Sequence, residues 1–169
     1  MCSNTISIEG ILGEGDLTAA VIQKKILALH EEKTRAMLSI DSEGGSIDDV
    51  IDIAAFCGYF GIPFDTCAKG KVYSAAFLLF CCGERRLAAT NAEFWYHRPL
   101  QYVHGQEDDW AGIGRYLEFR ESAVTNEVMR RALAYPSESD TENNMLSIPF
   151  LMKAGVVTGL MDRWEPAGS

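Results

Sequence analysis

Short apolar runs of strand length alternate with amphipathic segments of helix length in the first half of this chain, and this alternation constrains the fold most. The strand-like runs are residues 6–12, 36–40 and 64–68. Apolar residues at helical spacing follow the first two runs, and an almost wholly apolar, helix-like run ending at Cys82 follows Ser74. Strands that alternate with helices predict an α/β fold built from βαβ units.

Polar residues mark the expected ends of these elements. Asp16 is predicted to cap the first helix. Ser46 and Asp49 have the spacing of a capping box, which predicts that a second helix begins there. The strand over 36–40 is expected to stop at the polar and glycine-rich residues that begin with Asp41.

The second half of the chain is predicted to hold one long amphipathic helix between two shorter pieces. Its apolar stripe includes Trp110 and recurs at helical spacing. The elements expected there are a strand over 93–96, the long helix over 108–134, a polar loop over 135–144, a short helix over 148–154 capped by Ser147, and a final strand at Val156-Val157.

Length and charge narrow the class of protein. At 169 residues the chain is expected to form a single domain over residues 1–169, with a flexible tail at 165–169. A formal net charge of −9 without a basic cluster argues against nucleic-acid binding. The sequence has neither a signal peptide nor an apolar run of the roughly 20 residues that span a bilayer, so we expect a cytoplasmic protein that does not bind membranes.

Cysteine and histidine usage gives no sign of a metal site. The five cysteines form no CxxC pair, and most of them lie in apolar segments. Buried free thiols in a reducing cytosol are therefore expected. The three histidines are scattered without ligand spacing, so no metal is expected.

One group of residues suggests acyl-transfer chemistry. Ser74 stands at the start of an expected helix, the pair Gly44-Gly45 precedes it, and His97 follows it in the segment Tyr96-His97-Arg98-Pro99. Such a site needs a nucleophile, a base that removes its proton, and backbone N–H groups that stabilise an oxyanion. A serine at a helix start is also a common capping residue, which is the alternative interpretation of Ser74.

The order of these motifs is similar to that of the Clp protease proteolytic subunit (ClpP) family. The similarity covers roughly residues 6 to 162 and includes the serine, the His-x-Pro segment, the long helix, and the short capped helix near the end. The resemblance implies the spiral of ββα units that ClpP shares with crotonases. It also implies that the helix over 108–134 serves as a handle between stacked rings.

The resemblance implies roles for individual residues. Ser74 matches the family nucleophile, and His97 matches its general base. Gly45 and Ala75 match the two backbone donors of the oxyanion hole. The family association therefore implies a serine endopeptidase, a hydrolase that works in proteolysis without a cofactor.

The resemblance also implies partners. The segment Gly44-Gly45-Ser46 matches the edge to which a substrate peptide adds as a strand. A peptide or unfolded protein is therefore the expected substrate, and a homo-oligomer of stacked rings the expected assembly. The chain begins almost directly at its first strand, so we expect the family's N-terminal loop to be largely absent, and a Clp-type ATPase is not counted among the expected partners.

The third member of the triad departs from the family pattern. The aspartate position falls on Asn143, which carries no charge and would orient the histidine only through its carbonyl oxygen. Three interpretations follow. The site works weakly with Asn143, or Asp140 or Glu142 takes the role, or the site is degenerate and the protein is a ring or scaffold subunit.

Two other chemistries are compatible with the residues. In a crotonase-type acyl-CoA enzyme, the Glu43 carboxylate would approach the substrate through the glycine turn. At the position of Glu43 the ClpP family has proline. In a serine–lysine dyad, Lys69 or Lys71 would replace the histidine, although a lysine in the turn before the nucleophile is expected to point outward.

Overall fold

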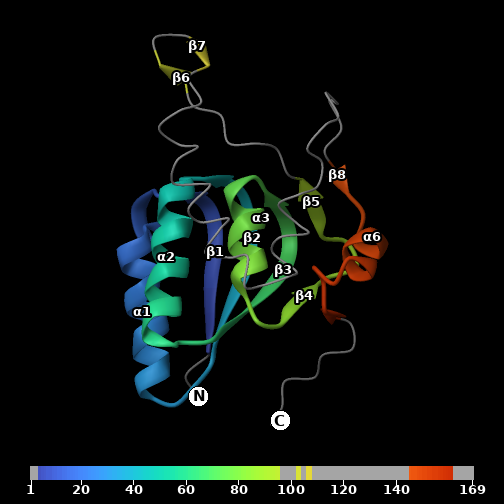
Figure 1. Ribbon diagram of the computed structural model, residues 1–169. Coiled ribbons are helices and arrows are strands. Elements are labelled where there is room, and N and C mark those ends of the chain that lie inside the picture. The colour runs from blue at the N-terminus through green and yellow to red at the C-terminus, as the bar shows by residue number, and fades with distance from the viewer. Residues whose placement is uncertain (1–3, 96–101, 104–105, 108–144, 162–169) are drawn as a thin grey trace.

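The computed structural model describes residues 4–95, 102–103, 106–107 and 145–161 (Figure 1). The predicted alternation of strands and helices is present in these residues. In chain order the elements are β1 (Thr5–Leu12), the 3-10 helix η1 (Gly15–Leu17), α1 (Ala19–Glu31), β2 (Ala36–Gly45), α2 (Ile47–Phe60), β3 (Phe64–Tyr73), α3 (Ala75–Cys82), β4 (Arg86–Ala88), β5 (Glu93–Trp95), β6 (Tyr102–Val103), β7 (Gln106–Glu107), β8 (Met145–Leu146), α6 (Ile148–Lys153) and β9 (Gly159–Leu160).

A mainly parallel sheet forms the centre of the fold. Its strands follow the order β1-β2-β3-β4-β9, while β5 pairs with β3 in parallel and with β8 in antiparallel. Helices α1, α2 and α3 lie together on one face of the sheet (Figure 1). This is the arrangement expected when successive parallel strands are added in one direction by right-handed crossovers. The mixed α/β class is confirmed. The handle helix predicted over 108–134 lies outside the described residues, and the spiral of ββα units stays a prediction.

The core lies between the sheet and the helices α1, α2 and α3, with α3 the most deeply buried. Every residue of α3 from Ala75 to Cys81 is buried, as its apolar sequence predicts. Phe94 of β5 contacts this helix through two edge-to-face ring pairs, with its ring centroid 6.2 Å from that of Phe77 and 5.2 Å from that of Phe80. The inner face of β5 is therefore held against the helix that begins beside Ser74.

The strand β2 continues beyond its predicted end. The prediction that it stops at Asp41 is wrong, because the pairing with β1 extends through Gly45. Asp41 and Glu43 are exposed, while Ser42 and Gly44, which alternate with them, are buried. Side chains point alternately to the two faces of a strand, so polar residues can continue a strand when one of its faces meets solvent. The carboxyl end of β2 therefore has one buried face and one open face.

The helix predicted to begin at Ser46 is confirmed, with Ser46 as its N-cap, although the reciprocal bond of a capping box is not formed because the Ser46 N–H donates to the Leu12 carbonyl. The cap predicted for α1 is wrong. The Ser46 hydroxyl accepts a hydrogen bond from the Asp49 N–H at 3.1 Å. Asp16 lies inside η1. The N–H group of Ala19, at the start of α1, instead donates a hydrogen bond to Asp49 Oδ1 of α2 at 2.5 Å. A partner distant in sequence thus displaces the local cap.

The short C-terminal helix is also as predicted. The Ser147 hydroxyl caps α6 by accepting from the Phe150 N–H at 3.3 Å. The strand predicted at Val156-Val157 is wrong, because both residues are buried in a turn and the strand comes later, at β9. Their backbone groups make hydrogen bonds outside the sheet. Both N–H groups donate to the Leu151 carbonyl, and the Val156 carbonyl accepts from Arg86 Nε at 2.7 Å.

A buried carboxylate joins the amino-terminal ends of β2, β3 and β4. Asp65 is 1% exposed and accepts hydrogen bonds from Arg85 Nε at 2.9 Å, from the Arg85 N–H at 3.1 Å and from Arg35 at 3.3 Å. These bonds satisfy a charge that would otherwise be very unfavourable in the core.

We expect Asp65→Asn to destabilise the fold strongly. The substitution keeps the volume but removes the charge that accepts from Arg85 and Arg35, whose side chains are 57% and 38% exposed. The loss is therefore that of charge-assisted hydrogen bonds, about 1.5–3 kcal/mol. Urea denaturation followed by circular dichroism would measure the loss. Asp16→Asn is the matched control, since Asp16 is exposed. Equal unfolding midpoints for wild type and Asp65→Asn would contradict this account.

The thiols of the described cysteines are free, as predicted. Cys57, Cys67 and Cys81 are buried, and Cys82 is half-buried. Burial raises the pKa of the Cys57 thiol to about 11 and that of Cys81 to about 12, so neither is a nucleophile near neutral pH. The described residues contain no metal-binding cluster of His, Cys, Asp or Glu and no helix able to cross a membrane.

Candidate active site

Ser74 forms the whole connection between β3 and α3. Its backbone lies at φ 53° and ψ −123°, a conformation that side-chain-bearing residues adopt rarely. Holding a residue there costs about 1–3 kcal/mol, and such strain concentrates at functional sites. A sharp strand-to-helix turn of this kind also presents the serine oxygen in nucleophile elbows.

Backbone contacts fix the Ser74 turn. The Ser74 N–H donates to the Trp95 carbonyl at 2.8 Å, and the Ser74 carbonyl accepts from the Phe77 N–H at 3.0 Å. The Ser74 side chain makes no capping hydrogen bond to α3. The interpretation of Ser74 as a capping serine is therefore not supported by its geometry.

Gly44 packs directly against the Ser74 turn. It is buried at φ 104°, and a Cβ atom placed on it would lie 2.8 Å from the Tyr73 carbonyl oxygen and 2.9 Å from Ser74 Cβ. The same Cβ would lie 3.1 Å from the Ala75 nitrogen. Only glycine fits here, because both the space and the positive φ exclude a side chain. The glycine pair and the serine, far apart in sequence, meet at this point.

Gly45 and Ala75 directly follow Gly44 and Ser74, the two residues that are packed together. Gly45 is exposed at φ 135° and pairs with Leu12 of β1. Ala75 is the first residue of α3, so its N–H has no acceptor within the helix. Ser46, the predicted end of the substrate edge, is half-buried and occupied as the cap of α2. The structure thus brings together Ser74, Ala75 and the glycine pair.

The other predicted members of the triad lie outside the described residues. This holds for His97, for Asn143, and for the alternatives Asp140 and Glu142. The described chain reaches close to both ends of this gap: β5 ends at Trp95, and β8 begins at Met145.

A polar row on the open face of the sheet was not predicted from the sequence. Lys71 Nζ lies 2.6 Å from Glu43 Oε1, and the Tyr73 hydroxyl donates to Glu93 Oε2 at 2.5 Å. The hydrogen bond from Lys71 to Glu43, with the attraction of that carboxylate, raises the pKa of the lysine. The alternation of exposed and buried residues in β2, β3 and β5 was the available signal.

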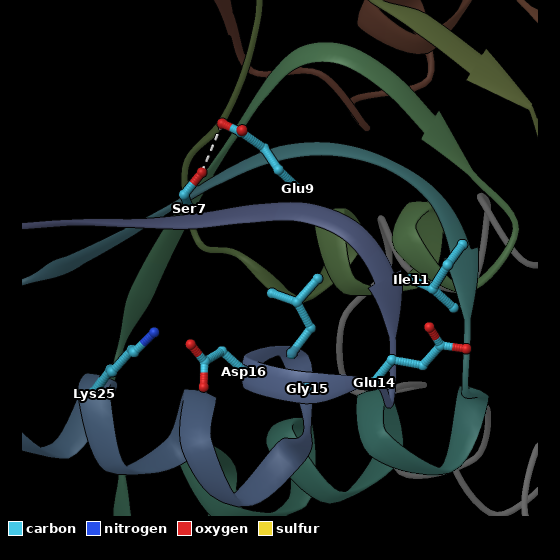
Figure 2. A pocket seen from close by; sticks show the side chains of 8 residues that line it. Ser7, Glu9, Ile11, Glu14, Gly15, Asp16 and Lys25 are labelled. Atoms are coloured by element: carbon cyan, nitrogen blue, oxygen red, sulfur yellow. Dashed lines mark hydrogen bonds between the residues drawn. The ribbon is translucent and has the colours of Figure 1, made fainter.

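A separate hollow of about 550 Å³ opens beside β1 and the start of α1 (Figure 2). It carries the carboxylates of Glu9, Glu14 and Asp16 together with Lys25, and Ser7 donates to Glu9 at 2.7 Å. All five side chains are exposed. Neither Ser74 nor the glycine pair lines it, so the hollow is no part of the candidate active site.

Comparison with known proteins gives the family. A sequence profile of the Clp protease family matches residues 5–145. The chain belongs to the Clp protease family. It is also similar to the ATP-dependent Clp protease proteolytic subunit of Leuconostoc citreum (strain KM20), with 25% identity over 141 residues that cover 81% of this chain and 68% of the relative.

Membership in the Clp protease family confirms the resemblance drawn from the motifs. It makes this chain a divergent member of a family of proteases. The matched range includes Ser74, His97 and Asn143. Their roles are argued below from the geometry around them.

Proposed function

We propose that this chain is a serine endopeptidase in which Ser74 attacks the substrate carbonyl and His97 acts as the general base. The observation that carries the proposal is the strained Ser74 turn pressed against Gly44. A turn that costs energy and caps no helix needs another reason to exist, and an exposed nucleophile beside backbone donors is such a reason.

The described end of β5 supports the role of His97. The Trp95 carbonyl accepts the Ser74 N–H, so the backbones of β5 and the nucleophile turn are in contact. His97 follows Trp95 by two residues, and each residue extends the chain by at most about 3.3–3.6 Å. The backbone that contacts the nucleophile turn therefore stands only two residues before His97 in the chain.

The pairing of β5 with β8 supports Asn143 as the third member. Phe94 pairs with Leu146, and Trp95 pairs with Met145, in antiparallel register. His97 follows Trp95 by two residues, and Asn143 precedes Met145 by two residues. The described pair of Trp95 and Met145 therefore joins the two strands that stand next to His97 and Asn143 in the chain. On this basis we assign Asn143 the role of orienting the imidazole.

Asn143 is preferred to the two acidic alternatives because it falls on the family's aspartate position when the chain is counted back from Ser147. Asp140 and Glu142 are the alternatives against which the Asn143→Asp experiment tests this assignment.

The proposed chemistry proceeds in two steps. His97 takes the Ser74 proton as Oγ bonds to the substrate carbonyl carbon, and it returns the proton to the amine nitrogen as the peptide bond breaks. Water then hydrolyses the acyl-enzyme with His97 again as base. The N–H groups of Gly45 and Ala75 stabilise the oxyanion in each step. Asn143 adds no charge that stabilises the imidazolium, so the reaction is expected to be slow.

The polar row argues against the competing chemistries. A serine–lysine dyad needs a neutral amine, but the raised pKa of Lys71 keeps it protonated beside Glu43. A crotonase-type role for Glu43 would need its carboxylate at the substrate, whereas it is paired with Lys71 on the open face. Neither alternative is favoured.

We also propose that the protein forms a homo-oligomer and cleaves peptides or unfolded proteins, as the family resemblance implies. Size-exclusion chromatography with light scattering would test the assembly. We expect a mass several times that of the 18.7 kDa chain. A strict monomer at micromolar concentration would rule out the ring arrangement. The cytoplasmic location stays a prediction.

Hydrolysis of fluorogenic peptides tests the proposed reaction. We expect slow, measurable turnover by the wild type and none above background by Ser74→Ala, because no other group replaces the nucleophile. Ser39→Ala, which removes another hydroxyl from the same sheet, serves as the control and should retain activity. Equal turnover by wild type and Ser74→Ala would mean that Ser74 is not the nucleophile.

A further inference from the structure

Ser42 carries a buried hydroxyl that the proposed mechanism does not use directly. It lies in β2 between the exposed residues Asp41 and Glu43 and is 2% exposed. Its hydroxyl donates to the Gly10 carbonyl at 2.6 Å and accepts from the Gly44 N–H at 3.0 Å. The single hydroxyl proton and an acceptor lone pair are thus both used.

These two hydrogen bonds bridge an irregularity in the pairing of β1 and β2. Glu9 pairs with Asp41, but the next paired residue of β1, Ile11, faces Gly44, so β2 contains an extra residue at this point. Such a bulge interrupts the backbone ladder and turns the strand, and bulges are frequent next to active sites. The Ser42 hydroxyl joins one backbone group from each strand across the interruption.

The bridge acts on the peptide group just before the proposed oxyanion donor. Holding the Gly44 N–H toward Ser42 fixes the plane of the peptide between Glu43 and Gly44. The next peptide carries the Gly45 N–H, and both glycines have positive φ, at 104° and 135°. Glycine is free to rotate at such positions, so an outside contact must select the orientation.

We propose that Ser42 is a positioning residue for the oxyanion hole: its hydroxyl sets the glycine turn so that the Gly45 N–H faces the carbonyl attacked by Ser74. The inference rests on the proposed serine peptidase function. Ser42 acts through the backbone and does not touch the substrate. Its loss should slow the chemical step while leaving substrate binding largely unchanged.

Saturation kinetics with a fluorophosphonate separate these two effects. Ser74 Oγ bonds to phosphorus, fluoride leaves, and the serine proton passes to the base, while the phosphoryl oxygen occupies the oxyanion hole. Removing a whole donor costs about 10²–10³ in rate, so for Ser42→Ala we expect a fall of about tenfold to hundredfold in kinact, with KI changed less than about twofold. Ser39→Ala, a buried serine on the same strand, is the control for lost packing and should keep its kinact.

Ser42→Cys guards against a folding defect, because it keeps the volume but accepts hydrogen bonds weakly. We expect its kinact to lie between those of wild type and Ser42→Ala. If wild type reacts at Ser74 and both Ser42 variants keep kinact within about twofold, the positioning role is overturned while the proposed function stands. If Ser39→Ala loses as much as Ser42→Ala, the effect is general packing, and the positioning role is again overturned. A wild type that does not react at Ser74 overturns the proposed function and this inference with it.

Discussion

Asn143→Asp is expected to increase peptide hydrolysis by at least about tenfold, and by as much as about 10⁴-fold if the triad geometry is already in place. The upper figure is the loss seen when a triad aspartate becomes asparagine in a serine protease. The physical reason is the imidazolium that forms when His97 takes the serine proton. An aspartate that accepts a hydrogen bond from the imidazole stabilises that charge, whereas an asparagine offers only a carbonyl dipole. The readout is kcat on a fluorogenic peptide, because the effect belongs to the chemical step.

Asn144→Asp is the matched control for this substitution. It adds the same charge one residue away, at a position to which the family resemblance assigns no catalytic role. We expect its kcat to stay within about twofold of wild type, since a charge that does not bond to the imidazole adds little. Equal acceleration by both variants would indicate a general charge effect. No acceleration by Asn143→Asp would remove Asn143 from the proposed triad.

Gly44→Ala is expected to abolish the reaction for a steric reason. The new Cβ would stand 2.8 Å from the Tyr73 carbonyl oxygen and 2.9 Å from Ser74 Cβ, so the glycine turn and the nucleophile turn must move apart. A displacement of about 1 Å at a reacting group can cost about 10²-fold in rate. We expect at least that loss in kcat, together with lower thermal stability from the strained φ of 104°.

Gly58→Ala shows whether a glycine replacement matters in itself. Gly58 lies inside α2, and a Cβ atom placed on it would meet none of the described residues outside its own helix within 4 Å. Alanine there should stabilise the helix by about 0.5–1 kcal/mol. Its kcat should equal that of wild type. Wild-type turnover by Gly44→Ala would contradict the contact between the two turns on which the site is built.

Local patterns were sufficient for the parts of the fold that depend on neighbours in sequence. The capping roles of Ser46 and Ser147 follow from a hydroxyl and an N–H three residues apart, and both are present. The cap proposed for Asp16 failed because Asp49, on another helix, takes its place. The strand expected at Val156-Val157 failed because Leu151 and Arg86 occupy its backbone groups. Contacts distant in sequence decided both errors.

The candidate site shows the same division. The serine, the glycine pair and the position of the helix were predictable from motif order, and the family match confirms the resemblance that links them. The strain at Ser74 was not predictable, since it arises where the Trp95 carbonyl and Gly44 hold the turn from two other strands. The bridge made by Ser42 was equally hidden, because it depends on a bulge between β1 and β2. The sequence therefore indicates which residues form the candidate site, whereas the contacts that hold them in place depend on the fold.

Intact-mass analysis after fluorophosphonate treatment tests the central claim most directly, because it asks whether Ser74 is an activated nucleophile. Wild type and Ser74→Ala would be treated in parallel, with Asn143→Asp as a third sample. We expect one adduct on the wild type, none on Ser74→Ala, and faster labelling of Asn143→Asp. An adduct on Ser74→Ala, or none on either the wild type or Asn143→Asp, would contradict the account.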